Sequence, residues 1–259
     1  MRLTISLAQI DIALGRPVEN LAKVEGMIAE ASQRGSQIVL LPELWSTGYD
    51  LERAEEHART TERVLVRLTD LAKERSLFII GSLLSAKVGR LYNRATILSP
   101  QGDLVGEYDK IHLFRLMEEE RYFAPGTETP LFDFPWGKGA LAICYDLRFP
   151  ELFRKYALGG ARVVFLPAEW PYPRLEAWRV LLRARAIENQ FFMVGCNRVG
   201  ESKGKVFFGH SGIYDPWGEP VLEGGEEERL LTAEIDLDVV DEARRKIPVF
   251  EDRREELYR

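Results

Sequence analysis

One stretch of the chain combines a nucleophile with backbone geometry that could activate it. The apolar run 140–143 is short enough for a buried strand, and Cys144 follows it directly. Pro150 and Glu151 then mark the start of a helix. A cysteine between a buried strand and a helix lies near backbone N–H groups that stabilise a thiolate or an oxyanion. The stretch therefore predicts a catalytic cysteine, and the alternative is a small cysteine of the core.

Two charged residues also follow predicted strands and could complete a site with this cysteine. Glu43 comes after the apolar run 37–41, where a buried carboxylate would have a raised pKa and could act as a general base. Lys110 follows a short strand near residue 104 and lies among aromatic residues, so it could be a fixed cation facing an oxyanion. Such a site needs no histidine. The alternatives are a surface carboxylate at a helix start and a solvated lysine.

The other glutamates and the histidines give weaker evidence for a catalytic role. The run of glutamates at 118–120 would ordinarily be solvated, although one member could turn inward. We expect His57 to face solvent and His112 to make a structural hydrogen bond. His210 lies in a sequence that lacks the last glycine of the G-x-S-x-G motif. Because the sequence has no HExxH, GxGxxG or Walker motif, we predict no metal and no cofactor.

The composition is that of an ordinary globular protein. The 259 residues are 46% hydrophobic and 29% charged, and the net charge of −6 argues against nucleic acid or an anionic membrane as partner. No apolar run approaches the roughly 20 residues that span a bilayer, and the first residues lack a signal-peptide core. Cys144 and Cys196 form no CxxC pair, so we expect reduced thiols, a cytoplasmic protein and a core position for Cys196.

Hydrophobic periodicity predicts a chain that alternates strands with helices. Strands are expected at 3–10, 37–41, 77–84, 91–98, near 104, 140–143, 162–166, 191–196, 209–214 and 230–235. Helices are expected at 20–34, around a buried stripe at 64–71, at 151–158 and at 175–189, with an ordered loop at 111–126. This alternation places each candidate residue directly after a strand or in the loop that follows it.

The chain contains one internal echo and no interdomain linker. Segment 35–42 resembles segment 160–167, and both follow a helix, which suggests a pseudo-symmetric layered sandwich. No stretch rich in Pro, Ser and Gly divides the chain, so we predict a single domain over residues 1–259. The charged end, residues 242–259, carries scattered apolar side chains and is expected to pack on a second subunit.

Three motifs resemble the signatures of the nitrilase superfamily of carbon–nitrogen hydrolases. They are Leu-Pro-Glu-Leu at 41–44, Tyr-Asp-Lys-Ile-His-Leu-Phe at 108–114 and Ile-Cys-Tyr-Asp-Leu-Arg-Phe-Pro-Glu at 143–151, in the family's order. The resemblance covers essentially the whole chain. It implies a four-layer α-β-β-α sandwich, a homodimer or higher homo-oligomer with C-terminal arms that reach across, and a catalytic triad. The triad residues would be Glu43, Lys110 and Cys144.

The same resemblance implies one more glutamate in the site. Many members of the superfamily carry it seven residues before a glycine, in the segment that follows the lysine motif. Counting back from Gly126 gives Glu119, with Glu118 and Glu120 as the alternatives. This glutamate would orient the lysine or the substrate rather than move protons.

Within the superfamily, segments 168–171, 184–190 and 195–200 are most similar to the bacterial ω-amidase branch. That branch removes the terminal amide of small 2-oxo acids such as 2-oxoglutaramate or 2-oxosuccinamate, giving the acid and ammonia through a thioester. Glu169 stands where an asparagine is common in the branch, which leaves the charge of the substrate open. The alternatives are an N-carbamoyl amine, a deaminated-glutathione-like peptide, an aliphatic amide, or a non-catalytic binding or scaffold protein.

We expect the substrate pocket to form around the cysteine motif. The backbone N–H of Tyr145 would join Lys110 in holding the oxyanion. Arg148 could receive a substrate carboxylate through bidentate pairing, or could hold Asp146 or a neighbouring loop. Trp170 could wall the pocket or be a plain core residue. The candidate substrate-binding residues are Tyr49, Phe114, Tyr145, Arg148, Glu169 and Trp170.

Overall fold

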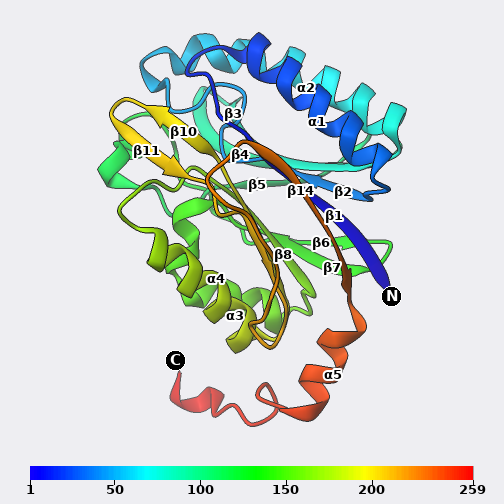
Figure 1. Ribbon diagram of the computed structural model, residues 1–259. Helices are drawn as coiled ribbons and strands as arrows, with labels where there is room; N and C mark the ends of the chain where they lie inside the picture. The colour runs from blue at the N-terminus through cyan, green and yellow to red at the C-terminus, as the bar shows by residue number, and fades with distance from the viewer. Residues whose placement is uncertain (259) are drawn as a thin grey trace.

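The computed structural model describes residues 1–258, which form two six-stranded sheets stacked between two helical layers. Helices α1 (Pro17–Gln33) and α2 (Ala54–Arg75) cover the outer face of one sheet (Figure 1). Helices α3 (Pro150–Leu158) and α4 (Leu175–Asn189) cover the outer face of the other. The prediction of a four-layer α-β-β-α sandwich is therefore confirmed.

The first sheet has the strand order β14-β1-β2-β3-β4-β5, in which β1, β2 and β3 run parallel. Its strands are β1 (Arg2–Gln9), β2 (Ile38–Leu40), β3 (Phe78–Lys87), β4 (Arg90–Leu98), β5 (Leu104–Asp109) and β14 (Arg229–Asp236). Strand β2 contains the core of the first echoing segment and lies in the middle of the parallel triplet.

The second sheet has the order β13-β12-β9-β8-β7-β6, in which β7, β8 and β9 run parallel. Its strands are β6 (Leu131–Phe134), β7 (Gly137–Leu141), β8 (Val163–Ala168), β9 (Phe192–Asn197), β12 (Gly212–Tyr214) and β13 (Pro220–Glu223). A separate hairpin is formed by β10 (Val199–Ser202) and β11 (Lys205–Phe208). Strand β8, from the second echoing segment, takes the place that β2 has in the first sheet.

Side-chain alternation explains why the central strands are apolar on both faces. In β2, Ile38 and Leu40 pack in the cluster between the two sheets, whereas Val39 packs in the cluster under α1 and α2. Each fully buried side chain of this size stabilises the fold by roughly 1.5–3 kcal/mol. The strands are thereby fixed in register, and their ends become fixed points for the residues that follow.

Four short strands were not predicted from the sequence. Strands β6, β10, β11 and β13 have four residues each and include exposed or half-buried positions, so their hydrophobic pattern is too short to detect. The prediction for His57 was wrong. Its side chain is only 2% exposed, because it lies on the inner face of α2 and its Nε2 is 2.7 Å from Oδ2 of Asp50.

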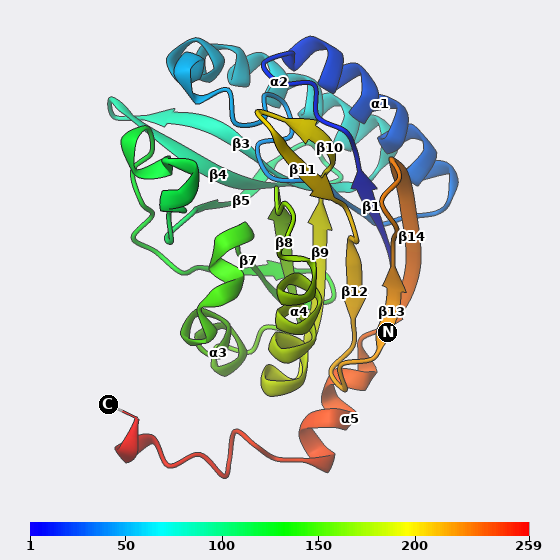
Figure 2. The ribbon, with the colours of Figure 1, turned by 60° about the vertical axis from the view of Figure 1, so that its left-hand side comes forward.

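The C-terminal segment leaves the sandwich and runs past its helical layer. Helix α5 (Asp238–Lys246) begins before the predicted arm, and the chain then continues to the short 3-10 helix η5 (Glu255–Leu257) near α3 (Figure 2). The ring of Phe250 packs under the guanidinium groups of Arg154 and Arg244. Within residues 1–258, no helix is long and apolar enough to cross a membrane.

Candidate active site

The candidate residues meet because strand ends from both sheets converge. Glu43 follows β2 and Lys110 directly follows β5, both in the first sheet. Cys144 follows β7 and Glu169 directly follows β8, both in the second sheet. All four residues are buried. The site therefore forms because each of its charged or nucleophilic residues follows a strand, and these strand ends lie close together.

The backbone holds Cys144 on a sharp turn. Its φ of 45° lies in the left-handed region, which is strained for a residue other than glycine, and it opens the 3-10 helix η4 (Cys144–Arg148). The carboxylate of Asp146 fixes this turn: Oδ2 accepts hydrogen bonds from the Ile143 N–H at 2.8 Å and the Tyr108 O–H at 2.7 Å. The thiol thus projects from a rigid corner.

Asp146 also explains the role of His112. Oδ1 of Asp146 is 2.7 Å from Nδ1 of His112, and the imidazole ring stacks on Phe149 with centroids 3.6 Å apart. His112 is thus a structural residue, as predicted. Among the described residues Arg148 donates no hydrogen bond to Asp146, so the suggestion that it holds this aspartate was wrong. Arg148 instead lies with Cζ 5.0 Å over the ring of Trp170.

A buried ion cluster surrounds the thiol. Nζ of Lys110 donates to Oε1 of Glu43 at 2.7 Å and to Oε1 of Glu119 at 2.6 Å, and all three side chains are fully buried. Oε2 of Glu119 accepts from the Phe114 N–H at 2.7 Å. Glu119 is the member of the acidic run that turns inward, because the 3-10 helix η3 (Glu119–Arg121) leaves its neighbours exposed.

The two oxygens of Glu43 have different surroundings. Oε1 accepts three hydrogen bonds, from Lys110, from Nδ2 of Asn93 at 2.7 Å and from Oη of Tyr49 at 2.8 Å. Oε2 accepts one backbone hydrogen bond, from the N–H of Glu169 at 2.9 Å. Oε1 is therefore saturated, and Oε2 has the free capacity to take a proton.

Cys144 and Glu43 have opposite pKa shifts. Burial, and then the negative charge of Glu43, raise the pKa of the Cys144 thiol well above its usual value. Burial would also raise the pKa of Glu43, but the charge of Lys110 and the hydrogen bonds outweigh it and lower that pKa. The pair is thus a neutral thiol beside an ionised carboxylate, which suits a general base that removes the proton during attack.

Lys110 stays protonated in this cluster. Burial would lower its pKa, but the charges of Glu119 and Glu43 outweigh burial and raise it. For Glu119, burial is the larger effect and raises the pKa despite the neighbouring ammonium group. A permanent cation beside the thiol can hold an oxyanion.

A small cavity opens directly onto Cys144. It has a volume of about 10 Å³, roughly the room for one water molecule, so a substrate must push its walls apart. The lining residues are Phe114, Cys144, Tyr145, Arg148, Glu169, Trp170, Pro171 and Arg174. Five of the six predicted substrate-binding residues are in this set.

The prediction that the sixth residue, Tyr49, lines the substrate cavity was wrong. It does not line this cavity but belongs to the ion cluster, because its hydroxyl lies within hydrogen-bond distance of Oε1 of both Glu43 and Glu119. No pattern in the sequence indicates this contact, since Tyr49 lies in a loop without hydrophobic periodicity. Cys196 is buried in the core, as predicted.

Sequence reasoning missed three residues of the site. Asn93 was detectable as a polar residue inside the apolar strand β4, and Arg198 as a charged residue directly after β9. Nη1 of Arg198 donates to Oε2 of Glu169 at 3.1 Å, and both side chains are fully buried. Arg174 had no comparable signal, because it lies in the loop before α4.

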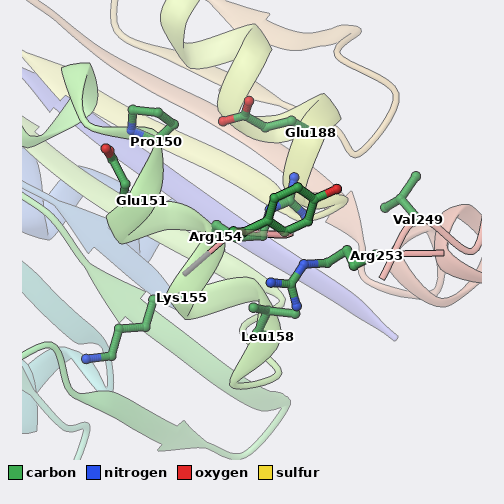
Figure 3. Close-up of a pocket in the computed structure, with 9 residues that line it drawn as sticks. Pro150, Glu151, Arg154, Lys155, Leu158, Glu188, Val249 and Arg253 are labelled. Carbon is green, nitrogen blue, oxygen red and sulfur yellow. The ribbon is translucent and has the colours of Figure 1, made fainter. Parts of the chain in front are cut away.

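A larger cavity lies elsewhere and holds no cysteine. It has a volume of about 660 Å³ and opens between α3 and the C-terminal segment, with Arg154 and Arg253 among its walls (Figure 3). Size alone would make it the candidate site, but Cys144 lines the small cavity. Residues 1–258 contain no group of three or more side chains arranged to bind a metal ion.

A cysteine on a strained turn, beside a buried carboxylate and a fixed ammonium group in an α-β-β-α sandwich, defines a class of hydrolases that act through a thiol. The sequence profile of the carbon–nitrogen hydrolase family matches residues 4–245. The chain belongs to this family, and it is a carbon–nitrogen hydrolase.

Individual relatives match most or all of the chain. It is 45% identical to the 2-oxoglutaramate amidase of Bacillus subtilis (strain 168), over 100% of both chains. It is 35% identical to the omega-amidase NIT2 of Bos taurus, over 93% of this chain and 91% of that one. The crystal structure of a carbon–nitrogen hydrolase from Helicobacter pylori G27 superposes with a TM-score of 0.95 at 25% identity, over 99% of this chain and 97% of that chain.

Proposed function

We propose that this enzyme is an ω-amidase that hydrolyses the terminal amide of a small 2-oxo acid, such as 2-oxoglutaramate or 2-oxosuccinamate. The observation that carries the proposal is the position of the Cys144 thiol beside the ionised carboxylate of Glu43, at a cavity whose walls include Arg148 and Arg174. The likeness to the 2-oxoglutaramate amidase of Bacillus subtilis supports the choice of substrate.

Acylation of the thiol is the first half of the reaction. Glu43 takes the thiol proton on Oε2 while the sulfur of Cys144 bonds to the amide carbon. The electron pair of the C=O bond moves to the oxygen, which Lys110 and the Tyr145 N–H hold, each such donor contributing roughly 3–4 kcal/mol. When the C–N bond breaks, Glu43 returns its proton to the nitrogen, and ammonia leaves a thioester on Cys144.

Hydrolysis of the thioester is the second half. Glu43 removes a proton from water as the water oxygen bonds to the acyl carbon. The C–S bond then breaks, and the proton on Glu43 returns to the sulfur, which restores the thiol and releases the acid. Glu119 touches Lys110 but not the thiol, so it positions the ammonium group and moves no proton.

Two arginines are available for the carboxylate of the substrate. Arg148 and Arg174 line the cavity, and neither forms an ion pair within the part of the chain that the structure describes. Arg148 is exposed and stacked on Trp170, while Arg174 is half-buried over Phe114. Guanidinium groups suit bidentate binding of a carboxylate. Their side chains can also move aside to widen the cavity.

Ammonia release from a panel of amides tests this function. The panel contains 2-oxoglutaramate, 2-oxosuccinamate, an N-carbamoyl amine and a simple aliphatic amide, each with wild type and Cys144→Ala. We expect release chiefly from the 2-oxo amides and none from Cys144→Ala, whose fold should survive the loss of one small atom. Release from the other amides alone would reject the substrate, and an active Cys144→Ala would reject the mechanism.

The assembly is part of the same proposal. We propose a single domain that acts in the cytoplasm as a homodimer, with residues 242–259 packed on the partner. Apolar side chains exposed on this arm and on α3 and α4 support an interface, with Ile247 50% and Leu257 66% exposed. Light scattering should give twice the chain mass for wild type. After deletion of residues 247–259 it should give the mass of a single shortened chain.

A further inference from the structure

One oxygen of the Glu169 carboxyl group has no hydrogen-bond partner among residues 1–258. The side chain is fully buried, and Oε2 accepts a hydrogen bond from Nη1 of Arg198 at 3.1 Å. Oε1 is buried and has no hydrogen-bond partner in the described chain. Glu169 also lines the cavity that opens onto Cys144. Burial of an unpartnered polar atom is unfavourable, and at the wall of a binding cavity it indicates a partner supplied by the ligand.

Burial favours the neutral form of Glu169, and the positive charges near it compensate for burial only in part. Arg198 is shared, since its Nη2 also donates to Oδ1 of Asp11 at 3.0 Å. Lys110 is committed to two other carboxylates, and the ionised Glu43 lies close enough to accept the backbone N–H of Glu169. Burial, opposed mainly by Arg198, raises the pKa of Glu169 to about 8.

The proton of a neutral Glu169 has only one favourable position. Oε2 accepts from Arg198, so the proton must be on Oε1. The carboxyl group then presents an O–H donor to the cavity, and a substrate must supply an acceptor. Of the oxygens on a 2-oxo amide, the amide oxygen binds Lys110 and Tyr145, and the carboxylate binds the arginines. The 2-oxo oxygen remains.

We propose that neutral Glu169 donates a hydrogen bond from Oε1 to the 2-oxo oxygen and so selects 2-oxo amides over amides that lack this group. The inference rests on the proposed ω-amidase function and deepens it. Glu43 and Glu169 would then divide the work: one carboxyl group moves the proton, and the other recognises the substrate.

A matched substrate pair tests the selection. 2-Oxosuccinamate and succinamate differ only in the 2-oxo group, so the ratio of their kcat/KM values reports its recognition. Glu169→Gln keeps an N–H donor at this position, whereas Glu169→Leu removes it at similar volume. We expect wild type and Glu169→Gln to prefer the 2-oxo amide, and Glu169→Leu to reduce that preference by roughly ten- to a hundredfold.

The pH profile provides a second measurement that does not depend on the leucine variant folding. As the pH rises through about 8, Glu169 ionises and loses its donor. Wild-type kcat/KM for 2-oxosuccinamate should fall there, while Glu169→Gln should show no such fall. Circular dichroism and thermal unfolding establish that each variant is folded.

The outcomes separate this inference from the proposed function. If wild type prefers the 2-oxo amide but Glu169→Leu loses activity equally on both substrates, Glu169 is structural and only the inference fails. A wild-type activity that rises through pH 8 would mean that an ionised carboxylate is needed, and would also overturn it. Ammonia from neither substrate with wild type would reject the function, and the inference with it.

Discussion

Glu43 and Glu169 are buried carboxyl groups from the two halves of the molecule, and their pKa values are shifted in opposite directions. Each follows the middle strand of a parallel triplet, β2 or β8, and each is fully buried in the same cluster. Glu43 accepts four hydrogen bonds and has a lowered pKa. Glu169 accepts one, from Arg198, and burial raises its pKa to about 8.

This difference shows that strand position alone does not determine the chemistry of a buried carboxyl group. Both side chains are fully buried, and burial disfavours the ionised form of each. The compensating groups then decide. The charge of Lys110 and four hydrogen bonds compensate Glu43, whereas Glu169 accepts a hydrogen bond only from the shared guanidinium of Arg198 among the described residues and also lies near the negative charge of Glu43. The first can act as a base at neutral pH, and the second can act as a donor.

The largest effect should come from exchanging the base. Glu43→Gln keeps the shape but cannot take a proton, so kcat should fall by roughly 10²–10⁴-fold. Glu169→Gln is the matched control, because it makes the same change at the carboxyl group that follows β8 and should retain most activity near neutral pH. Steady-state kinetics on one 2-oxo amide compares them. Equal losses in the two variants would contradict the division between base and donor.

Removing the Lys110 cation should destabilise the folded protein, because Glu43 loses the charge that keeps it ionised. Lys110→Met leaves Glu43 and Glu119 buried without their shared cation, which should lower the free energy of unfolding by about 3–5 kcal/mol. The loss should be smaller at pH 5 than at pH 8, since protonation of one glutamate lets the two share a hydrogen bond. Denaturant unfolding at both pH values measures it.

The control for this change is an exposed lysine on the same protein. Lys155 lies on the solvent side of α3, so Lys155→Met should alter the free energy of unfolding by about 0.5 kcal/mol or less. A Lys110→Met protein as stable as this control would mean that the buried ion cluster contributes nothing to folding.

The sequence predicted those site residues that directly follow buried strands. The apolar runs before Glu43, Lys110 and Cys144 marked buried strands, and parallel or neighbouring strands bring their ends together. The internal echo suggested a layered sandwich, and the resemblance to the nitrilase superfamily implied its four α-β-β-α layers. Each of these signals is local in the sequence, so no three-dimensional information was needed.

Contacts made by loop residues could not be predicted in this way. Tyr49 reaches two carboxylates that are 6 and 70 residues away, and nothing in its own neighbourhood specifies either contact. His57 was misassigned because a charged helix hides one polar residue on its buried face. The charge state of Glu169 depends on how Arg198 is shared, which only the packed structure determines.

Stability should report the charge of Glu169 directly. Its folded pKa of about 8 is above the usual value of 4.5, so between these values the folded state holds one more proton than the unfolded state. Wild type should therefore lose about 1.4 kcal/mol per pH unit from this group as pH rises through the window, and no more above it. The comparison is the free energy of unfolding against pH for wild type and Glu169→Gln. Parallel curves would mean that Glu169 is ionised in the folded protein.

The smallest effect concerns the hydroxyl group that touches both carboxylates of the ion cluster. Tyr49 has one phenolic proton, yet its Oη contacts Glu43 and Glu119, and burial raises the pKa of this phenol well above its usual value. Tyr49→Phe removes one of the three donors to Oε1 of Glu43. The pKa of Glu43 should then rise, because its ionised form loses a hydrogen bond. We expect kcat/KM to fall by about tenfold near neutral pH.

Tyr156→Phe is the matched control for this change. Tyr156 is equally buried, but its hydroxyl donates to the backbone oxygen of Leu141 at 2.7 Å and touches no carboxylate. It should lose stability without a shift in the acid limb of the pH profile, whereas Tyr49→Phe should move that limb to higher pH. If both variants shift the limb alike, the effect arises from packing. If neither does, Lys110 and Asn93 suffice to keep Glu43 ionised, and the number of donors matters less than the nearest charge.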